Sequence, residues 1–326
     1  MTMERFQPYK SRWKEIVLTI LLILNVLVWV SVWGGQREKS LRVYFLDVGQ
    51  GDAILVESPA GNRLLIDSGR NRQVISELGR AMPFGEKDIE VVIATHPDAD
   101  HIGGMPEVFD RFDVSLHVSP GIKEDGELEN LVTKKVAAEK SQTLTASRGQ
   151  VVDLGGGAKL TILFPDRDVS DWVSNDASIV ARLDYGESSF LFTGDAGIKT
   201  ENILISRPQE IDADVLKVGH HGSRTSTSLS FAEAVSPEYS VISAGKDNSY
   251  GHPHSEVLKI LESAGGEIVE TSEHGMILFE SDGKEINLKR EAEAGSCFSR
   301  RSNTSPYVLR FSFSAIFITI SSALAL

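Results

Sequence analysis

The sequence predicts an α/β protein built as a layered sandwich and preceded by a membrane helix. Three observations support this fold class. An apolar run covers residues 16–33, segments with strand character form two groups that each carry helices, and a dense set of histidines and aspartates follows a buried strand. The chain has 326 residues, of which 41% are hydrophobic, and this is enough for one large domain or two modest ones with a proper core.

The apolar run IVLTILLILNVLVWVSVW, residues 16–33, would form about 27 Å of helix, close to the thickness of a hydrocarbon core. Trp13, Trp29 and Trp33 lie near its ends, as interfacial aromatic residues often do. Basic residues are slightly more frequent before the run, so we expect residues 1–15 to be cytoplasmic. This predicts a single-pass protein of the cell membrane with an extracytoplasmic catalytic domain. A cleaved signal peptide is the alternative, but the run is long for one and no small-residue cleavage site follows it.

A short polar linker, residues 34–40, separates this helix from the globular part, residues 41–289. The tail, residues 290–326, begins with a polar stretch whose composition does not favour folding. It ends in an apolar stretch that contains Arg310, so we expect a disordered tail, with a weak second membrane segment as the alternative. Cys297 is the only cysteine, which excludes an intrachain disulfide and a cysteine-based metal site.

The first half of the globular part begins with strands and continues with helices. Segments with strand character cover residues 41–48, 53–58, 63–69 and 89–96, and the last is a continuous apolar run typical of a strand buried on both faces. Helical patterns cover residues 71–81, 105–112 and 128–140.

The second half repeats this mixture of strands and helices. Two hairpins are predicted over residues 151–165 and 178–195, the second turning at residues 185–187. A strand running into a loop, a helix and a further strand follow over residues 213–223, 230–235 and 239–245. Ser255 is placed to cap a helix that ends on glycines, and two strands, residues 267–272 and 276–281, close the domain.

The stretch VVIATHPDADHIGG contains four candidate metal ligands within six residues. They leave the buried strand at the edge where α/β proteins place their sites, and they are His96, Asp98, Asp100 and His101. Their spacing lets the side chains diverge toward two neighbouring points, which suits two metal ions about 3.5–4 Å apart. Gly103 and Gly104 would let the backbone turn tightly beside them. The alternative is an acidic loop that caps a helix and carries incidental histidines.

This pattern resembles the HxHxDH signature of the metallo-β-lactamase fold superfamily, which implies a four-layer αββα sandwich and a pair of divalent cations. The chain departs from the signature at Asp98, where most members have histidine. A carboxylate oxygen is a harder ligand than an imidazole nitrogen, so the site should accept Mn²⁺ or Mg²⁺ more readily, while Zn²⁺ stays an alternative. We therefore expect two divalent cations, Zn or Mn.

Five further segments resemble one branch of the superfamily, the extracytoplasmic hydrolase domain of ComEC-type competence proteins. They are FLDVGQGDAILV, LLIDSG, FTGD, LKVGHHGSRTSTS and NSYGHPH, and the similarity covers roughly residues 41–279. ComEC proteins carry many membrane helices and this chain has one apolar run of that length, so a channel function does not transfer.

The resemblance implies roles for residues outside the cluster. Asp195 would bridge the two metal ions. The third histidine of the superfamily is absent, and Asn175 is its expected substitute, with Asp176 and Ser178 as rivals. His252 is expected to be a metal ligand, and His220 a ligand or a general acid. Two further histidines, His221 and His254, would only orient the loop.

Other residues are expected to support the site. Asp67 would hold a ligand imidazole through its free N–H. Asp47, Gln50 and Asp52 would form a loop at the rim, with turn chemistry an equal alternative to a catalytic role. Asp100, besides its role as a ligand, and His220 are the predicted catalytic residues. We expect His117, in a strand, and His274, in a turn, to be structural.

The predicted activity is hydrolysis of a phosphodiester, with DNA in a competence-related role as the favoured substrate. Two bridged cations lower the pKa of a bound water toward about 7 and stabilise the attacking and leaving oxygens of a phosphodiester. The formal net charge of −13 argues for a small phosphodiester or another ester instead, because Lys217 and Arg224 are the only basic residues beside the HHGS loop. A binding module for nucleic acid or phosphate, without turnover, is the alternative of another class. Protein partners are not predicted.

Overall fold

The computed structural model describes residues 13–34, 40–122, 126–207, 210–291 and 318–320. Helix α1 (Trp13–Gly34) belongs to one unit, and a second, compact unit begins at Ser40. No helix within the described residues is both long enough and apolar enough to cross a membrane, so the membrane helix expected over residues 16–33 is not supported. The expectations for the N-terminal residues 1–12, for most of the linker and for most of the tail lie outside the described residues.

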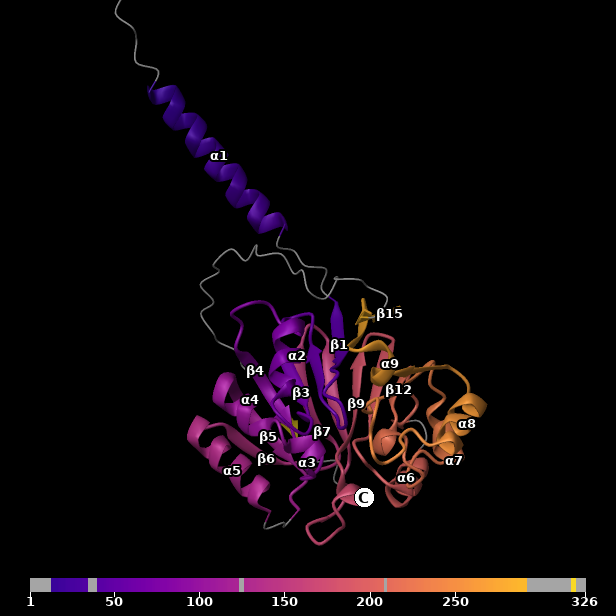
Figure 1. Ribbon diagram of the computed structural model, residues 1–326. Coiled ribbons are helices and arrows are strands. Elements are labelled where there is room, and N and C mark those ends of the chain that lie inside the picture. The colour runs from indigo at the N-terminus through magenta and orange to yellow at the C-terminus, as the bar shows by residue number, and fades with distance from the viewer. Residues whose placement is uncertain (1–12, 35–39, 123–125, 208–209, 292–317, 321–326) are drawn as a thin grey trace, which may run out of the picture. The chain divides into compact units, whose positions relative to one another are not determined.

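Two eight-stranded sheets form the middle of the compact unit (Figure 1). The first has the order β15-β14-β1-β2-β3-β4-β5-β6, and its strands are β1 (Leu41–Phe45), β2 (Ile54–Glu57), β3 (Arg63–Ile66), β4 (Asp88–Ile93), β5 (Asp113–Ser119), β6 (Gln142–Thr145), β14 (Ile277–Ser281) and β15 (Ile286–Arg290). The second has the order β13-β12-β11-β10-β9-β8-β7-β16, and its strands are β7 (Gln150–Gly155), β8 (Ala158–Phe164), β9 (Val180–Tyr185), β10 (Ser188–Phe192), β11 (Val215–Lys217), β12 (Tyr239–Ile242), β13 (Glu267–Glu270) and β16 (Ile318–Ile320).

Helices cover the outer face of each sheet, which gives the four layers seen in Figure 1. The helices beside the first sheet are α2 (Gln73–Ala81), α3 (Ala99–Ile102), α4 (Met105–Arg111) and α5 (Glu127–Glu139). Those beside the second sheet are α6 (Ile198–Ile205), α7 (Leu229–Val235) and α8 (Ser255–Ala264), and the short α9 (Thr271–His274) follows β13. The predicted α/β class is confirmed for this unit.

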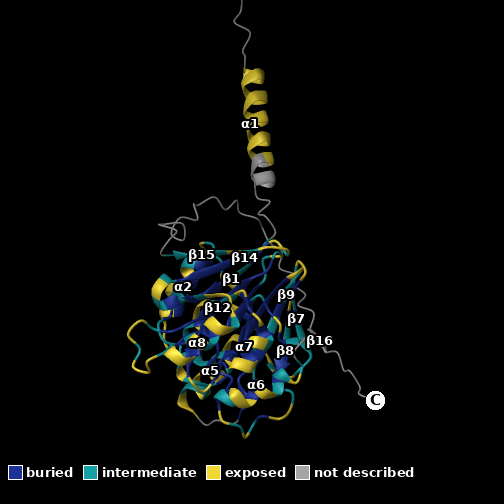
Figure 2. Ribbon diagram, turned by 90° about the vertical axis from the view of Figure 1, so that its right-hand side faces the viewer, coloured by how far each residue is buried: buried dark blue, intermediate teal, exposed yellow. Residues whose placement is uncertain are grey.

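Three apolar clusters hold the layers together. Alternation along β1 shows how one strand serves two of them, because Val43 and Phe45 pack between the sheets while Tyr44 packs against the helices. The third cluster lies between the second sheet and α6, α7 and α8. Figure 2 shows the buried residues concentrated in the sheets and the exposed ones on the outer helices and loops. The central strands of both sheets are therefore buried on two faces, as their nearly continuous apolar sequences require.

Strand direction decides where a site can form. Strands β3 to β6 are parallel to one another, and so are β10 to β13. The loops at the carboxyl ends of these parallel strands meet at one edge of the sandwich, which is the usual location of sites in α/β proteins.

Two local predictions need correction. Ser255 does not cap α8, because the helix begins at Ser255 itself and His254 occupies the capping position without a side-chain hydrogen bond. Gly103 and Gly104 have ordinary helical backbone angles, so they are not needed for a special turn. They are needed for close packing, because a Cβ on Gly103 would lie 2.1 Å from the carbonyl oxygen of Arg70.

Candidate metal centre

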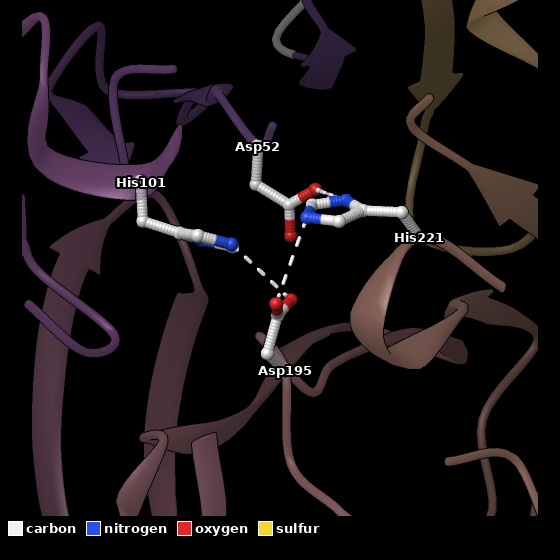
Figure 3. Close-up of side chains that lie close together, drawn as sticks. All are labelled: Asp52, His101, Asp195 and His221. Carbon is white, nitrogen blue, oxygen red and sulfur yellow. Dashed lines mark ion pairs between the residues drawn. The ribbon is translucent and has the colours of Figure 1, made fainter. Parts of the chain in front are cut away.

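Asp195, which follows β10, is the centre of a buried group of histidines. Its carboxylate lies between imidazoles from the loops after β4 and β11, three of which are almost completely buried. Figure 3 shows two of them, His101 and His221, pointing toward Asp195 from different segments. The four contacts join Asp195 Oδ1 to His101 Nε2 at 3.2 Å, and Asp195 Oδ2 to Nε2 of His96 at 3.8 Å, of His220 at 3.6 Å and of His221 at 3.6 Å.

Two more carboxylates extend this group on either side. Asp98 Oδ2 lies 3.7 Å from His96 Nε2, and Asp100 Oδ2 lies 3.5 Å from His221 Nε2. The cluster predicted from one short stretch of sequence thus divides into two sets of donors that share Asp195. The expected assignment of these side chains to two metal ions stays a prediction.

The geometry fits divalent cations. The Nε2 atoms of His96, His101 and His221 and the Oδ1 atom of Asp195 are buried and have no hydrogen-bond partner. Buried polar atoms without partners are costly, so their position around Asp195 indicates a place for a ligand. Two donors on one tetrahedral cation, each about 2.1 Å from it, are roughly 3.4 Å apart, which is close to the spacings observed. The donor set therefore suits metal ions better than direct hydrogen bonds.

His221 takes a more central place than predicted. It was expected to orient its loop, but its Nε2 faces Asp100 and Asp195, and its Nδ1 lies 2.9 Å from the carbonyl oxygen of Ser243. A metal-binding histidine usually uses its second nitrogen in this way. His221 therefore has the surroundings of a ligand.

Asp67, after β3, supports the centre from behind. Its Oδ2 lies 2.8 Å from His101 Nδ1 and accepts a hydrogen bond of 2.6 Å from Thr95 Oγ1. Its Oδ1 accepts a second bond of 2.8 Å from the backbone N–H of Thr95. This contact with the imidazole of His101 is the arrangement expected for Asp67, and it leaves the Nε2 of His101 directed at Asp195.

The prediction that Asp52 lies at the rim is wrong. Asp52 is fully buried behind His221. Its Oδ1 lies 3.3 Å from His221 Nδ1, and its Oδ2 lies 2.8 Å from the Nζ of Lys217, whose side chain is also completely buried. Burial by itself raises the pKa of Asp52, but the positive charges of Lys217 and His221 lower it to about 2. A compact buried cluster is formed by Asp52, His101, Asp195 and His221. Lys217 neutralises the carboxylate of Asp52.

Asn175, the expected substitute for the missing third histidine, lies beside His220. Asn175 Nδ2 lies 3.4 Å from ring nitrogens of His220, whereas Ser178 Oγ accepts a hydrogen bond from the N–H of Asp195 and Asp176 faces Lys199 at 3.8 Å. Asn175 thus contacts a histidine that faces Asp195, and its role as the substitute stays a prediction. Sequence reasoning missed its neighbour Ser174, whose Oγ donates a hydrogen bond of 2.6 Å to Asp98 Oδ1. A serine in a polar loop gives no signal of this kind.

His252 lies beside the two adjacent histidines. Its ring is 5.7 Å from that of His220 and 6.3 Å from that of His221, and its Nδ1 is buried without a hydrogen-bond partner. His254 is 5.0 Å from it, at the start of α8. The structure thus places His252 at the rim, and its role as a ligand stays a prediction.

The remaining rim residues make turn contacts. Asp47 Oδ1 accepts a hydrogen bond from the N–H of Gly49, and Gln50 Oε1 accepts one from the N–H of Gly245. Gly51 lies so close to the ligand loop that a Cβ on it would be 2.0 Å from the carbonyl oxygen of Asp100. This loop therefore packs tightly against the loop that carries Asp100, and Asp52 is its only side chain in the buried cluster of His101, Asp195 and His221.

Backbone strain is concentrated at the site. Asp67, His220 and His221 have φ angles of 57°, 47° and 54°, in the left-handed region that residues other than glycine seldom adopt. Strained conformations of this kind persist where the surrounding structure holds them, commonly at functional sites. Two successive left-handed histidines direct neighbouring imidazoles toward the same carboxylate.

The carboxylates and imidazoles of the centre shift one another's pKa values. Burial alone would raise the pKa of Asp195, but the imidazoles of His101 and His221 hold it well below its usual range. Burial opposes a charge on His221, yet Asp195 and Asp52 raise the pKa of His221 to about 9. For His96 burial prevails, together with the charge on His101, and lowers its pKa to about 3. Protons on imidazoles thus balance the carboxylates, and metal ions would displace those protons.

His117 lies outside this group and has a structural environment. It is half-buried on β5, its ring is 5.8 Å from that of Phe109, and its Nε2 is buried without a hydrogen-bond partner. It lines a mainly apolar cavity of about 260 Å³ with residues of α5 such as Val132 and Val136. Burial lowers the pKa of His117 to about 4.

This gives a prediction for stability against pH. Because the pKa is lower in the folded chain than in the unfolded one, the unfolded chain takes up the proton first as the pH falls below about 6.5. The wild-type protein should therefore lose about 3 kcal/mol relative to His117→Leu by about pH 4. Urea unfolding of both metal-free proteins across this range measures the difference. A difference that does not change with pH would contradict the assigned environment.

The fold and the donor set together define a metal-dependent hydrolase of the metallo-β-lactamase type, and comparison with known proteins agrees. Residues 46–246 match the model of the metallo-beta-lactamase superfamily, and the chain belongs to this superfamily. In solved structures, the metallo-beta-lactamase fold protein YhfI from Bacillus subtilis has a TM-score of 0.50 at 16% identity, covering 74% of this chain and 99% of that one. This likeness shows the fold.

Curated relatives confirm the resemblance to competence proteins. ComE operon protein 3 of Bacillus subtilis is 31% identical over 81% of this chain and 35% of its own length. Competence protein ComA of Neisseria gonorrhoeae is 30% identical over 75% of this chain and 32% of its own length. The chain therefore spans about a third of the length of these relatives, and it matches them over most of its own.

Proposed function

We propose that the chain is a metal-dependent phosphodiesterase whose favoured substrate is DNA, in a role related to competence. The observation that carries this is the buried carboxylate of Asp195 among four histidines, with three imidazole nitrogens and one of its own oxygens lacking partners. The names of the relatives supply the link to competence. Placement of the domain outside the cell stays a prediction, which fractionation of cells and protease accessibility would test.

Two donor sets would hold the cations. His96 and Asp98 belong to one, Asp100, His101 and His221 to the other, and Asp195 to both. When bound, divalent cations supply Lewis-acid chemistry that activates water and neutralises phosphate oxygens. The mixture of carboxylates and imidazoles accommodates either Mn²⁺ or Zn²⁺.

His220 is suited to contact both the centre and the substrate. Its Nδ1 lies 2.9 Å from Thr225 Oγ1, its Nε2 faces Asp195, and a quarter of its side chain (26%) is exposed, whereas His96, His101 and His221 are closed off. Burial lowers the pKa of His220, so the ring is neutral at neutral pH; it has one nitrogen lone pair to offer, and its remaining N–H is too weak an acid to release its proton. We therefore favour a metal-binding or proton-accepting role for His220 over that of a general acid.

The charge distribution limits the length of nucleic acid that the protein can hold. The net charge is −13, Lys217 is buried against Asp52, and the exposed Arg224 pairs with Glu256 at 3.2 Å. Lys217 was expected to contribute to a basic track, and its burial removes it from one. A short contact with one or two nucleotides is consistent with this surface, and a small phosphodiester is the second candidate for the same reason.

Hydrolysis assays test the proposal. The full chain, purified without metal and supplied with Mn²⁺ or Zn²⁺, is given bis(p-nitrophenyl) phosphate, single-stranded DNA and duplex DNA. Turnover that requires the metal supports the phosphodiesterase. Binding of two metal ions with no turnover of any diester would favour a module that only binds nucleic acid or phosphate.

A further inference from the structure

Tyr250 is an exposed aromatic residue at the rim of the metal centre. Among the described residues of the compact unit, Phe84 and Tyr250 are the large aromatic side chains that are mostly exposed, at 96% and 54%. Phe84 precedes β4 and so lies at the end of the strands away from the site. Tyr250 is in the loop after β12, at the carboxyl end, where the site is. Only Tyr250 therefore offers a flat apolar surface near the proposed chemistry.

Two ring contacts, one stacked and one edge-to-face, connect Tyr250 to the centre. The Tyr250 ring lies 5.6 Å from that of His252, with 23° between their planes. His252 in turn lies 5.7 Å from His220, whose Nε2 is 3.6 Å from Asp195 Oδ2. One face of the tyrosine is thus supported by a ring that itself contacts the donor set.

The loop that carries Tyr250 is held in place by Asn248. The side-chain oxygen of Asn248 accepts hydrogen bonds from the N–H groups of Tyr250, at 3.2 Å, and His252, at 2.9 Å. Its side-chain nitrogen donates to the carbonyl oxygens of Gly245, at 2.8 Å, and His252, at 2.6 Å. Because one side chain fixes three backbone positions, the backbone that carries the ring is already ordered, which reduces the entropy cost of binding.

The surface chemistry indicates what this ring binds. The protein is acidic, and of the two basic residues beside the HHGS loop Lys217 is buried and Arg224 pairs with Glu256, so a contact with an uncharged part of the substrate would add affinity. A nucleobase is such a part, and stacking of one base on an aromatic side chain contributes about 1–3 kcal/mol without regard to sequence. We infer that Tyr250, supported by His252, is a stacking site for one base of a nucleotide whose phosphate lies at the metal centre. This inference rests on the proposed function and names its substrate as a nucleotide.

Paired substrates test the inference. The metal-loaded full chain is assayed with thymidine 5′-(p-nitrophenyl phosphate) and with ethyl p-nitrophenyl phosphate, which share a leaving group and differ in the nucleoside. For Tyr250→Ala we expect KM for the thymidine ester to rise about 10-fold, with little change in kcat and no change for the ethyl ester. The matched variant Tyr250→Phe keeps the ring and should keep the wild-type KM. Equal losses on both esters, or no loss on either, would overturn the stacking site.

A binding measurement separates this inference from the proposed activity. Calorimetry compares thymidine 5′-monophosphate with 2-deoxyribose 5-phosphate, which lacks the base, on the wild type and on Tyr250→Ala. Stacking predicts that the wild type prefers the nucleotide about 10-fold and that the variant loses this preference. If neither ester is hydrolysed, the proposed phosphodiesterase activity is wrong, but the binding comparison still tests the stacking site. Equal affinity of the wild type for the nucleotide and for 2-deoxyribose 5-phosphate would contradict the stacking site.

Discussion

Replacing Lys217 by methionine is expected to destabilise the metal-free protein by about 3–5 kcal/mol. Methionine is similar in length to lysine and, like the lysine stem, apolar, but it carries no charge. It leaves the fully buried carboxylate of Asp52 without the ammonium that lies 2.8 Å from it. An uncompensated buried charge is among the largest single effects that a substitution can have. Urea unfolding in the presence of a chelator measures the loss.

The double variant Lys217→Met with Asp52→Asn is the control. It removes both charges, so most of the lost stability should return, because replacing both members of a buried pair is often close to neutral. If the single variant costs less than about 1 kcal/mol, or if the double variant is no more stable than the single one, the two residues do not act as a pair.

Replacing Asp195 by asparagine is expected to reduce metal-dependent turnover by more than about 100-fold and to weaken metal binding at least as much. The variant keeps the shape of the side chain but lacks the negative charge that four histidine nitrogens approach within 3.8 Å. Loss of residues that only support a ligand already costs about 10–100-fold in comparable sites. Titration with Mn²⁺ or Zn²⁺, followed by the diester assay, measures both quantities.

Asp184→Asn is the matched control, because Asp184 lies on β9 and pairs with Arg182 away from the centre. It should bind metal and turn over substrate as the wild type does. Full activity of Asp195→Asn would contradict the assignment of Asp195 as the shared ligand.

Much of the fold follows from local pattern in the sequence. Apolar runs such as residues 89–96 and the hairpin over residues 178–195 predict buried strands and their partners. The cluster from His96 to His101 predicts a site, because side chains that bind metals and gather at the carboxyl end of a buried parallel strand are typical of one. The strands β6 and β15 were not predicted, because they are short and only partly buried.

The detailed roles of the two adjacent histidines depend on backbone geometry that periodicity does not reveal. His220 and His221 both adopt left-handed angles, so the usual alternation of side chains along an extended segment does not apply. As a result His221 is buried at the centre while His220 keeps an exposed side.

The sequence likewise does not indicate that Lys217 pairs with Asp52. Lys217 sits in an otherwise apolar strand, and Asp52 lies far from it along the chain. A lysine at such a position looks like a surface residue, and only the packing of the two sheets brings it to Asp52. Long-range charge pairs of this kind have no local signal.

Metal content provides the most direct test of the centre. The purified full chain is loaded with Mn²⁺ or Zn²⁺, passed through a desalting column and analysed by mass spectrometry beside a variant with Asp98→Ala and Asp100→Ala. Two donor sets that share Asp195 predict about two ions per wild-type chain and a clear loss in the variant. Equal numbers of ions in the two proteins would contradict the proposed centre.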